Sequence, residues 1–547
     1  MFKQKKFLTD KNCKIELLLV CVSFGLLWYF IFSSTGMFKA GFNYLVVDHM
    51  FIEEYFKPFN LLTTIYQSFI EEPIKYNERF FPVYTFLFRT VPHLYGLNPI
   101  TYYISSLIIC ISTSISFYIF GKLNKFSILE SILFSALIAL GEQSSSHAYI
   151  FPFPESTATF LLSLGLIFAE ISAIYKNNTK NILNSLFILF SMLAALNKES
   201  YILMLPALAF YKVWFESAVN NISLTKSLKN QKISIGILLI FFATIIAYIK
   251  LKHFTGQGYA GVDQTSFSIQ HISELLSFLV FRSFLIEAVL ICSIFLFFSK
   301  DNKKNLLNHK ISYLVFSGLI VLPQFVLFLK TGMNGNTHYL LPLVIGLAFL
   351  AIYPMRSIKN INNLLYWLIC LSLIILTFRQ FNTVESYFKQ RGYFLDDQQQ
   401  LVIDIKKCMV KKDAKILVYA NPYMQLEPLY SFRNVVIGEV LKINPNNLSI
   451  ATYGSIDSDY YSDQFKTFEN HLYSLTGSQQ KHTIDEFNNH LVKDMSISEL
   501  QQAQAIVIFN YPELIKTIQK NSNEWLDLNN YKNTLYPYND IGLLCKK

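Results

Sequence analysis

The sequence predicts an α-helical multipass membrane protein that carries a small α/β domain at its C-terminal end. Hydrophobic residues make up 52% of the 547 residues and charged residues only 15%, and the mean hydropathy is +0.33. An ordinary soluble domain carries about 25% charged residues, so a single globular enzyme does not fit this composition. The apolar residues arrive in blocks rather than being spread along the chain, as membrane-spanning helices require.

Blocks of about 17–25 apolar residues predict eleven membrane-spanning helices. They cover residues 15–34, 99–120, 127–141, 156–175, 181–196, 200–215, 233–251, 275–298, 311–329, 338–354 and 363–378. No small-residue cleavage site follows the first block, so we expect a spanning helix there rather than a cleaved signal peptide. The transmembrane domain is thus predicted over residues 1–378, with a long first outer loop at 35–98, and a polar domain over 379–547.

Lysine and arginine residues collect in alternate loops between these blocks. They are frequent at Lys3–Lys14, Lys226–Lys232 and Lys300–Lys310, whereas the loop 142–155 has none. By the positive-inside rule the N-terminus lies in the cytoplasm, and eleven spans then place residues 379–547 outside. The basic residues behind the net charge of +10 therefore reflect the orientation of the chain in the membrane, and we expect no nucleic-acid partner. The predicted location is the inner (plasma) membrane of a bacterial cell.

The polar C-terminal region has the pattern of a small α/β domain. Apolar spacing and short β-branched runs predict helices at 397–410 and 512–520 and strands at 415–420, 435–440 and 505–509. Cys408 and Cys545 are the two cysteines of this region, so a single disulfide is conceivable there. No GxGxxG or phosphate-loop motif occurs in it, so a nucleotide site has no support.

The first outer loop is long, charged and rich in aromatic residues. Leu61–Phe69 and Phe80–His93 are amphipathic, which predicts short helices in the membrane interface, with an inert interfacial collar as the alternative. Asp48 opens the loop, and His49 and Glu53 follow it. A carboxylate at a membrane–water boundary can take a proton from an acceptor hydroxyl. A solvated helix end would have the same residues.

Arg79 lies directly before the second amphipathic segment. Its guanidinium suits paired hydrogen bonds to a lipid phosphate, although an arginine that merely snorkels to the interface occupies the same position. His147 and Glu155 lie in the next outer loop, beside the aromatic run Tyr149–Pro154. Aromatic faces mixed with acids are typical of a carbohydrate or lipid-headgroup site, and also of a polar turn.

Charged residues inside or between apolar blocks form the last group of candidates. Lys198 and Glu199 separate two closely spaced blocks, so they must pair, reach the interface or line a wet cavity. Arg282 lies near the outer end of its block, where it would face an anionic headgroup, and His338 begins another block from the outside. An arginine at a bilayer centre costs about 2.5–3.5 kcal/mol. Together these residues predict an outward-facing, partly basic cavity and a lipid-phosphate substrate.

This arrangement resembles the multispanning glycosyltransferases of the GT-C fold. Asp48 matches the acid that follows the first helix in that family, and Glu78-Arg79-Phe80-Phe81-Pro82 is similar to its Arg-Phe-x-Pro stretch. Asn197-Lys198-Glu199-Ser200 resembles a lysine-containing segment between middle helices. His338-Tyr339-Leu340-Leu341-Pro342 resembles an Arg-Tyr-Leu-Leu-Pro-like segment, with histidine in place of arginine.

The resemblance implies a GT-C-like fold and an inverting transfer of sugar from a polyprenyl-phosphate-linked donor, with Asp48 as the base. The acceptor would be a glycan, lipid or protein of the cell envelope, and no cofactor is expected. Asp48-His49 stands where the family often has an acidic pair, so a divalent metal is possible but unsupported. The predicted substrate-binding residues are His49, Glu53, Arg79, His147, Glu155, Lys198, Glu199, Arg282 and His338.

Two other functions fit the same layout of spans. A polysaccharide polymerase, a ligase or a flippase for lipid-linked oligosaccharides also has many spans, but its largest outer loop is expected late in the chain. A non-catalytic membrane scaffold would use the C-terminal domain to bind a partner. Such a scaffold would tolerate neutralisation of Asp48, Arg79 and Lys198 together, whereas an enzyme would not.

Overall fold

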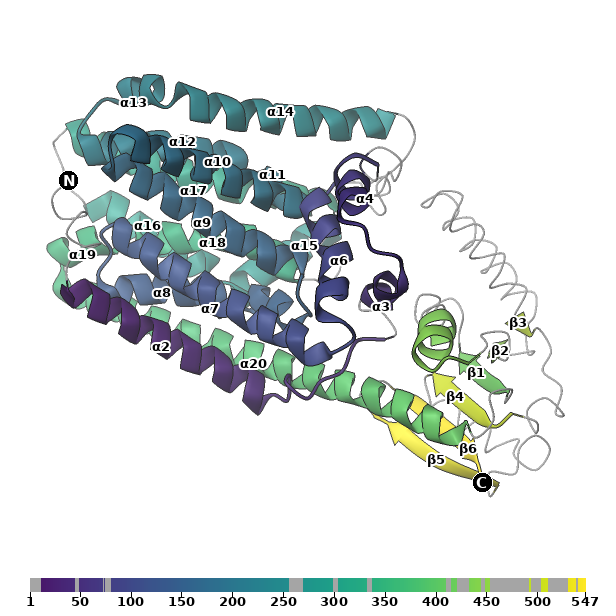
Figure 1. The fold of residues 1–547 in the computed structure, drawn as a ribbon. Helices are drawn as coiled ribbons and strands as arrows, with labels where there is room; N and C mark the ends of the chain where they lie inside the picture. Colours follow the sequence, from purple (N-terminus) through teal and green to yellow (C-terminus); the bar gives the residue numbers. More distant parts are fainter. Residues whose placement is uncertain are drawn as a thin grey trace. The chain divides into compact units, whose positions relative to one another are not determined.

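In a computed structural model of the chain, the described residues are 11–44, 49–71, 73, 80–254, 269–298, 304–331, 337–409, 415–420, 432–443, 448–452, 491–492, 503–509, 530–537 and 540–547. The chain divides into two compact units. The first comprises Met1–Thr35, Ile65–Leu87 and Tyr102–Phe388, and the second comprises Gly36–Thr64, Phe88–Thr101 and Lys389–Lys547. The predicted fold class is confirmed: the first unit is a bundle of apolar helices, and the second contains a β-sheet with helices (Figure 1).

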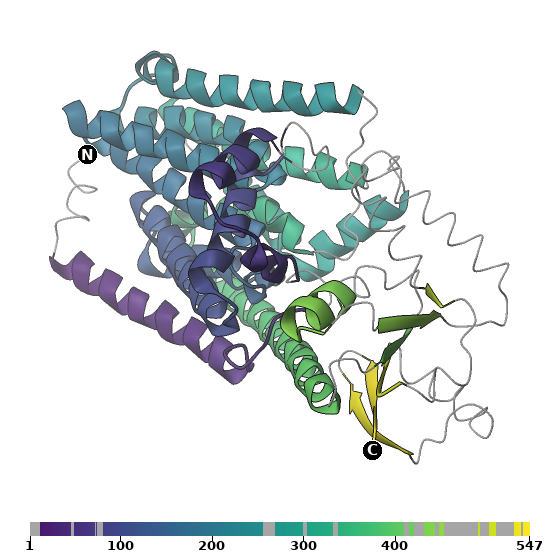
Figure 2. The same cartoon turned by 45° about the vertical axis from the view of Figure 1, so that its right-hand side comes forward.

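The helical unit is built from long apolar helices joined by short helical turns. Its elements are α2 (Lys11–Ser34), η1 (Gln67–Glu71), α7 (Pro99–Leu123), α8 (Ile128–Ala139), η2 (Glu142–Ala148), α9 (Pro154–Ile174), α10 (Asn177–Asn197), α11 (Glu199–Ile202), α12 (Leu205–Asn220), α13 (Leu224–Asn230), α14 (Lys232–Phe254), α15 (Ile269–Ser277), η3 (Phe278–Arg282), α16 (Leu285–Phe298), α17 (Lys304–Thr331), η4 (Thr337–Leu340), α18 (Leu341–Ile352), α19 (Met355–Ile361) and the first part of α20 (Asn363–Cys408). Helices α2 and α14 lie at opposite edges of this bundle in both views (Figures 1 and 2).

The number of spanning helices differs from the eleven predicted. Among the described residues, nine helices are long and apolar enough to cross a membrane, or ten if one bent pair counts as a single span. Nine spans keep residues 379–547 on the side opposite the N-terminus, as eleven do, whereas ten would put both on the same side. The block predicted at 127–141 forms α8, whose 12 residues extend only about 18 Å at 1.5 Å per residue. A hydrocarbon core is about 30 Å thick, so α8 is too short to span it alone.

The block predicted at 275–298 is a broken helix. A π-helical turn, η3, ends at Arg282, and the helix then bends by 71° before α16 continues. Ser283 has an extended backbone (φ −105°, ψ −169°), which interrupts the helical hydrogen bonds. Arg379 compensates by donating from Nη2 to the carbonyl oxygen of Phe281 at 2.8 Å. A side chain from α20 therefore stabilises the break.

Local sequence explains where α8 begins. Ser127 accepts a hydrogen bond from the backbone N–H of Glu130 at 3.2 Å, and the Glu130 carboxylate accepts one from the N–H of Ser127 at 2.7 Å. This reciprocal pair satisfies two backbone donors that the first turn of a helix leaves free.

The short α13, with Lys226 and Lys229, lies at the same end of the bundle as α19, with Arg356 and Lys359 (Figure 1).

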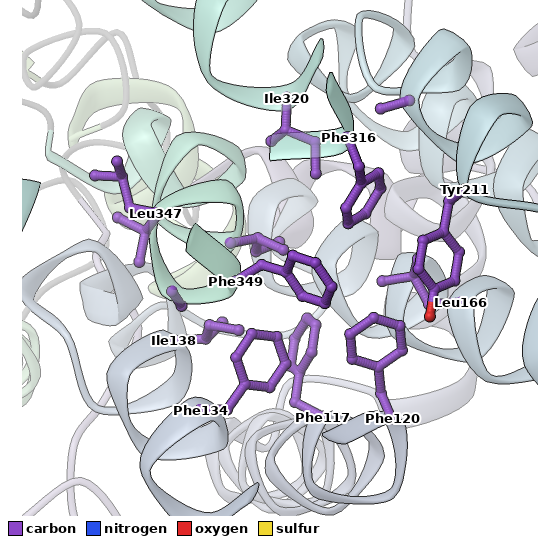
Figure 3. Packing of buried hydrophobic residues seen from close by; sticks show 14 of the residues in the cluster. Phe117, Phe120, Phe134, Ile138, Leu166, Tyr211, Phe316, Ile320, Leu347 and Phe349 are labelled. Carbon is purple, nitrogen blue, oxygen red and sulfur yellow. The ribbon is translucent and has the colours of Figure 1, made fainter. Parts of the chain in front are cut away.

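The core of the helical unit is aromatic and centres on α18. Every residue of α18 except Leu350 is buried, so this helix is apolar on all sides, as a central helix must be. Phe349 packs edge-to-face against Phe316, with ring centroids 5.0 Å apart, and also contacts Phe134 and Tyr211 (Figure 3). Such aromatic pairs add about 0.5–1.5 kcal/mol beyond the area they bury.

The second unit contains a six-stranded sheet with the order β3-β2-β1-β4-β6-β5. Strand β1 is parallel to β2 and β4, and β6 is antiparallel to β4 and β5. The strands are β1 (Ile416–Ala420), β2 (Leu448–Thr452), β3 (Leu491–Val492), β4 (Ala505–Phe509), β5 (Tyr531–Tyr536) and β6 (Ile541–Lys546). Helical segments of or entering this unit are α3 (His49–Phe56), α4 (Leu61–Tyr66), α6 (Pro82–Tyr95), η5 (Phe432–Val440) and the end of α20.

Most predictions for the C-terminal region are confirmed and one is wrong. The helix ending near 410 and the strands at 415–420 and 505–509 are present, while 512–520 lies outside the described residues. The run 435–440 forms the π-helix η5 instead of a strand. Its buried Phe432, Val436 and Ile437 face one side at helical spacing, and the Phe432 ring lies 6.2 Å from that of Phe509 on β4. Packing on the sheet therefore overrides the β-branched propensity.

Candidate functional site

Three distant segments of the helical unit bring charged side chains together. Glu155 lies in the first turn of α9, Lys198 lies between α10 and α11, and His338 lies in η4. Lys198 Nζ is 2.7 Å from Glu155 Oε1, and their side chains are 9% and 0% exposed. His338 is also buried and interacts electrostatically with both charges. We call Glu155, Lys198 and His338 the buried charge cluster.

A break between two helices places Lys198 in this cluster. Its backbone is extended (φ −154°, ψ 132°), so α10 ends there and α11 begins one residue later. Asn197 donates from Nδ2 to the carbonyl oxygen of Pro154 at 2.6 Å, which fixes the break against the start of α9. Gln324 on α17 donates to the carbonyl oxygen of Ser200 at 2.6 Å on the other side. Buried polar side chains thus hold the lysine in one place.

Burial of the Lys198–Glu155 pair costs solvation free energy. Two charges removed from water lose several kcal/mol of solvation each, and a buried ion pair often does not recover that loss. The N-terminal position of Glu155 on α9 is favourable for a carboxylate because the helix dipole is positive there. Its second oxygen, Oε2, has no hydrogen-bond partner among the described residues. Charges buried among the apolar helices of a membrane protein are a reason to look for a substrate or ion site.

Aromatic rings surround the cluster. Tyr149 and Phe153 stack with ring centroids 4.3 Å apart and an interplanar angle of 9°. Their centroids lie 6.0 Å and 5.7 Å from that of His338. Lys198 Nζ lies 4.7 Å from the centroid of the Tyr339 ring, within the range of a cation–π interaction. The predicted combination of aromatic faces and charges is therefore present around one group of residues.

Glu199 and Arg282 make separate polar contacts in the same unit. Glu199 Oε1 accepts a hydrogen bond from the backbone N–H of Phe80 at 3.2 Å, which ties the end of the first loop to the α10–α11 break. Arg282 Nη1 is 3.2 Å from Glu142 Oε1, and the arginine side chain is 63% exposed. Burial raises the pKa of Glu142, and the charge of Arg282 opposes that shift.

His147 is enclosed by the protein rather than open to a ligand. It is 2% exposed, and its ring packs edge-to-face on Trp28 with centroids 5.7 Å apart. Trp28 Nε1–H in turn donates to Ser114 Oγ at 3.0 Å. Burial lowers the pKa of His147 to about 4, so the imidazole is neutral at pH 7. Substrate binding by His147 stays a prediction.

Three of the predicted site residues lie wholly or partly outside the described residues. Asp48 and Arg79 lie outside the described residues, as does the side chain of His49. Glu53 lies on α3 in the second unit and is half-buried. Burial raises the pKa of Glu53, and Glu54 and Glu439 add to the rise while Lys57 opposes it.

Among the residues that the structure describes, no group of three or more His, Cys, Asp or Glu side chains could hold a metal ion.

Several residues near the cluster were not singled out from the sequence. Gln324 is a polar residue inside an apolar block, and that contrast is the signal that would have found it. Tyr387 donates a hydrogen bond to the Tyr149 hydroxyl at 3.2 Å, but a tyrosine on an exposed helix gives no comparable signal. Asn197 lies in the segment Asn197-Lys198-Glu199-Ser200, and its amide holds that segment to Pro154.

No protein-family profile matches the chain, and no curated protein matches it. A comparison with solved structures finds matches of low similarity. The crystal structure of ArnT from Cupriavidus metallidurans bound to undecaprenyl phosphate is 12% identical, and the alignment covers 98% of this chain and 98% of that chain with a TM-score of 0.44.

Proposed function

We propose that this chain is a GT-C-type membrane glycosyltransferase that moves a sugar from a polyprenyl-phosphate-linked donor to an acceptor outside the cytoplasm. The observation that carries the proposal is the buried charge cluster, in which Lys198 is held 2.7 Å from Glu155 beside aromatic rings. Structural stability alone gives little reason to retain a buried ion pair. A site that must receive an anionic lipid headgroup at the membrane boundary gives a direct one.

Lys198 is the proposed phosphate-binding cation. Its ammonium is desolvated and positioned in advance, so little reorganisation is needed when negative charge builds on a leaving phosphate. Glu155 holds that ammonium in place through the 2.7 Å ion pair. Arg79 and Arg282 are the further cations proposed to hold the lipid phosphate.

Asp48 is the proposed base of the reaction. The acceptor hydroxyl gives its proton to the Asp48 carboxylate while its oxygen attacks the anomeric carbon of the donor sugar. The new glycosidic C–O bond forms as the bond between that carbon and the phosphate oxygen breaks. Polyprenyl phosphate leaves with the bonding electrons, and the configuration at the anomeric carbon inverts. The acceptor is an envelope glycan, lipid or protein.

The decisive experiment measures release of undecaprenyl phosphate from synthetic undecaprenyl-phosphate sugars. Purified wild-type protein is compared with Asp48→Asn and Lys198→Ala, and with Asp396→Asn and Lys250→Ala as matched controls on exposed positions. We expect release by the wild type and both controls, with losses of at least about 10²-fold for the two site variants, the size of a single preorganised electrostatic contact.

Three other outcomes would each overturn part of the proposal. Wild-type rates for Asp48→Asn would remove that residue from the role of base. Binding of the lipid without release for every sugar tested would favour a flippase. Unchanged cell-envelope composition when Asp48, Arg79 and Lys198 are neutralised together would favour a non-catalytic scaffold.

A further inference from the structure

We propose that the C-terminal α/β domain positions the first loop for catalysis, and that Gln398 and Gln399 on α20 are its positioning residues. The inference rests on the proposed function, because the loop carries the proposed base. The contacts that support it all lie within the second unit, which joins residues 36–64 of the loop to residues 389–547. The domain thus has a task in transfer without carrying a reacting group of its own.

A buried polar contact joins the loop to α20. Gln398 Nε2 donates to Asn43 Oδ1 at 3.0 Å, and the two residues are 1% and 2% exposed. The Tyr44 hydroxyl donates to Gln399 Oε1 at 2.8 Å. These bonds link positions that are 355 residues apart in the sequence. Because a buried amide without its partner is unfavourable, the two bonds define one register between the loop and the helix.

Gly41 shows how closely the two segments approach. A Cβ atom at this position would lie 2.6 Å from Gln399 Oε1 and 2.7 Å from Gln399 Cβ, closer than real side chains come. Only glycine permits the backbone of the loop to lie against the glutamine at this point. Segment 40–44 is buried throughout, so the loop is held here by its backbone as well as by two side chains.

The far side of the same loop is also held within this unit. Phe51 on α3 packs against Phe88 on α6, with ring centroids 4.8 Å apart, and Phe59 packs against His93 at 4.7 Å. Lys442, just after η5, lies over the Phe56 ring with its Nζ 4.0 Å from the centroid. Tyr44 and α3, which flank Asp48 in the sequence, are therefore both held by contacts within this unit.

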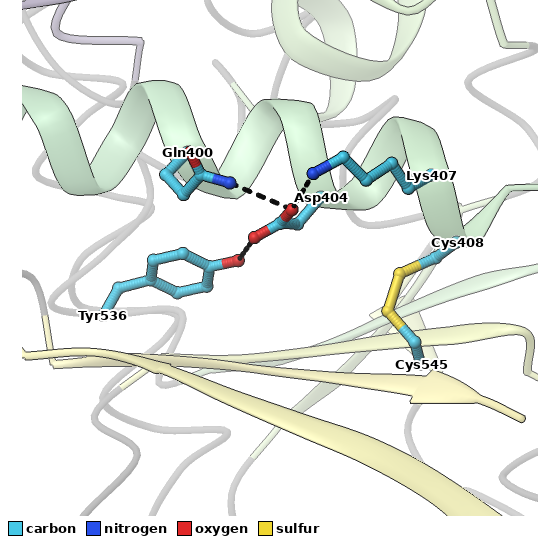
Figure 4. The surroundings of a disulfide bond; sticks show 6 residues. All are labelled: Gln400, Asp404, Lys407, Cys408, Tyr536 and Cys545. Carbon is cyan, nitrogen blue, oxygen red and sulfur yellow. Dashed lines mark hydrogen bonds and ion pairs between the residues drawn. A yellow bond between two sulfur atoms is a disulfide. The ribbon is translucent and has the colours of Figure 1, made fainter.

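The C-terminal domain is itself fastened to α20. Asp404 accepts a hydrogen bond from the Tyr536 hydroxyl of β5 at 3.0 Å, and a disulfide joins Cys408 to Cys545 on β6 (Figure 4). The sheet carries η5, which reaches α3 through Lys442. Contacts thus run from α20 to the sheet, from the sheet to η5 and from η5 to α3. Removal of the domain would leave the loop without these supports.

The first test measures loop order directly and does not depend on activity. Hydrogen exchange is followed in peptides covering residues 36–44 and 49–59 of the full-length protein in detergent. We expect Gln398→Ala/Gln399→Ala to exchange about tenfold faster there than the wild type, because the local contacts that protect the amides are gone. Gln390→Ala is the matched control, since it removes an exposed glutamine of the same helix. Equal exchange in all three proteins would overturn the inference.

The second test asks whether loop position matters for transfer. Gln399→Ala and Tyr44→Phe each remove the same hydrogen bond, so each should lower kcat by about 10²-fold with KM for the lipid donor within about twofold, as misplacement of a reacting group does. Gln399→Glu keeps the acceptor oxygen and should restore kcat. The pH dependence of kcat should shift in the two impaired variants, whereas mere loss of folded protein leaves it unchanged.

The two tests separate the two proposals. Faster exchange in the double variant together with no turnover by the wild type would retain the structural link and reject the glycosyltransferase. Wild-type turnover with unchanged kcat and pH dependence in Gln399→Ala and Tyr44→Phe would reject the positioning role and retain the enzyme. If Gln398→Ala/Gln399→Ala does not fold, Tyr44→Phe alone decides the outcome, because it removes one hydroxyl and no carbon.

Discussion

The buried pair of Lys198 and Glu155 combines a structural cost with the phosphate-binding role proposed for the lysine. Neither residue can be removed alone without leaving the other charge in an apolar surrounding. The same contact keeps a cation beside Tyr339, whose ring contacts that of His338. Stability and activity should therefore respond differently to substitution of this pair.

A double-mutant cycle separates the two effects. We expect Lys198→Met and Glu155→Gln each to destabilise the protein, with the lysine variant losing about 3–5 kcal/mol because it strands a buried carboxylate. The combined variant should recover most of that loss yet remain inactive in sugar transfer. Thermal unfolding in detergent and release of undecaprenyl phosphate measure the two quantities. Additive losses of stability, or activity in the combined variant, would contradict this account.

His147 makes stability depend on pH. Burial holds its pKa near 4 in the folded protein against 6.5 for the free side chain, so between these values the unfolded chain binds more protons. The free energy of unfolding is therefore unaffected by His147 above pH 6.5 and falls as the pH drops towards 4. The full loss is about 3 kcal/mol, at 1.36 kcal/mol per pKa unit. The unfolding temperature of the wild type should fall more steeply than that of His147→Leu between pH 6.5 and pH 4. Parallel curves would show that His147 is not the source.

Breaks in helices position the candidate site at the level of elements. The interruption at Lys198 turns the charged residue into the bundle, and the break after Arg282 puts that arginine beside Glu142. Continuous helices would carry both side chains in other directions. The central helix α18 supplies the opposite property, because its buried, close-packed surface leaves no freedom to adjust.

Close packing of α18 on α17 makes Gly346 sensitive to a single methyl group. A Cβ atom there would lie 2.8 Å from Val321 Cγ2 and 2.9 Å from Ile320 Cγ2. We expect Gly346→Ala to destabilise the protein by about 1–3 kcal/mol through overpacking. Gly236→Ala on α14 meets nothing within 4 Å and should be neutral or stabilising by about 0.5–1 kcal/mol. Unfolding temperatures of the two variants in detergent compare them, and equal shifts would refute the packing explanation.

At the scale of the whole molecule, the chain forms two units, and the loop between the first two long helices belongs partly to each. The second unit carries the disulfide between Cys408 and Cys545, whose Cα atoms are 5.6 Å apart. Disulfides persist in oxidising compartments. The bond therefore supports the prediction that this unit lies outside the cytoplasm.

Thiol labelling of intact cells tests this orientation. After mild reduction, an impermeant maleimide should label a variant that keeps only Cys408 and Cys545, and without reduction it should not. A variant that keeps only Cys13, near the N-terminus, is the matched control and should stay unlabelled until the cells are opened. Labelling of Cys13 in intact cells, or no labelling of the pair after reduction, would contradict the predicted topology. Labelling of the pair without reduction would contradict the disulfide.

Composition and the length of apolar blocks were enough to predict the multipass helical fold and most helix positions. Hydrophobicity and helix length are properties of consecutive residues, so a single sequence contains them. The same holds for strands β1 and β4, whose short β-branched runs are buried on both faces. The prediction of a strand at 435–440 was wrong because packing against the sheet, and not β propensity, decides the conformation of this run.

The sequence by itself determined the class of the protein and the residue types that its boundary with the membrane presents. Only the tertiary structure decided that Glu155, Lys198 and His338 form one cluster, and that Gln398 bonds Asn43 across 355 residues. Such pairings depend on how helices pack in three dimensions, and no local pattern encodes them. The physical reason is that burial and partner choice are set by neighbours distant in the chain.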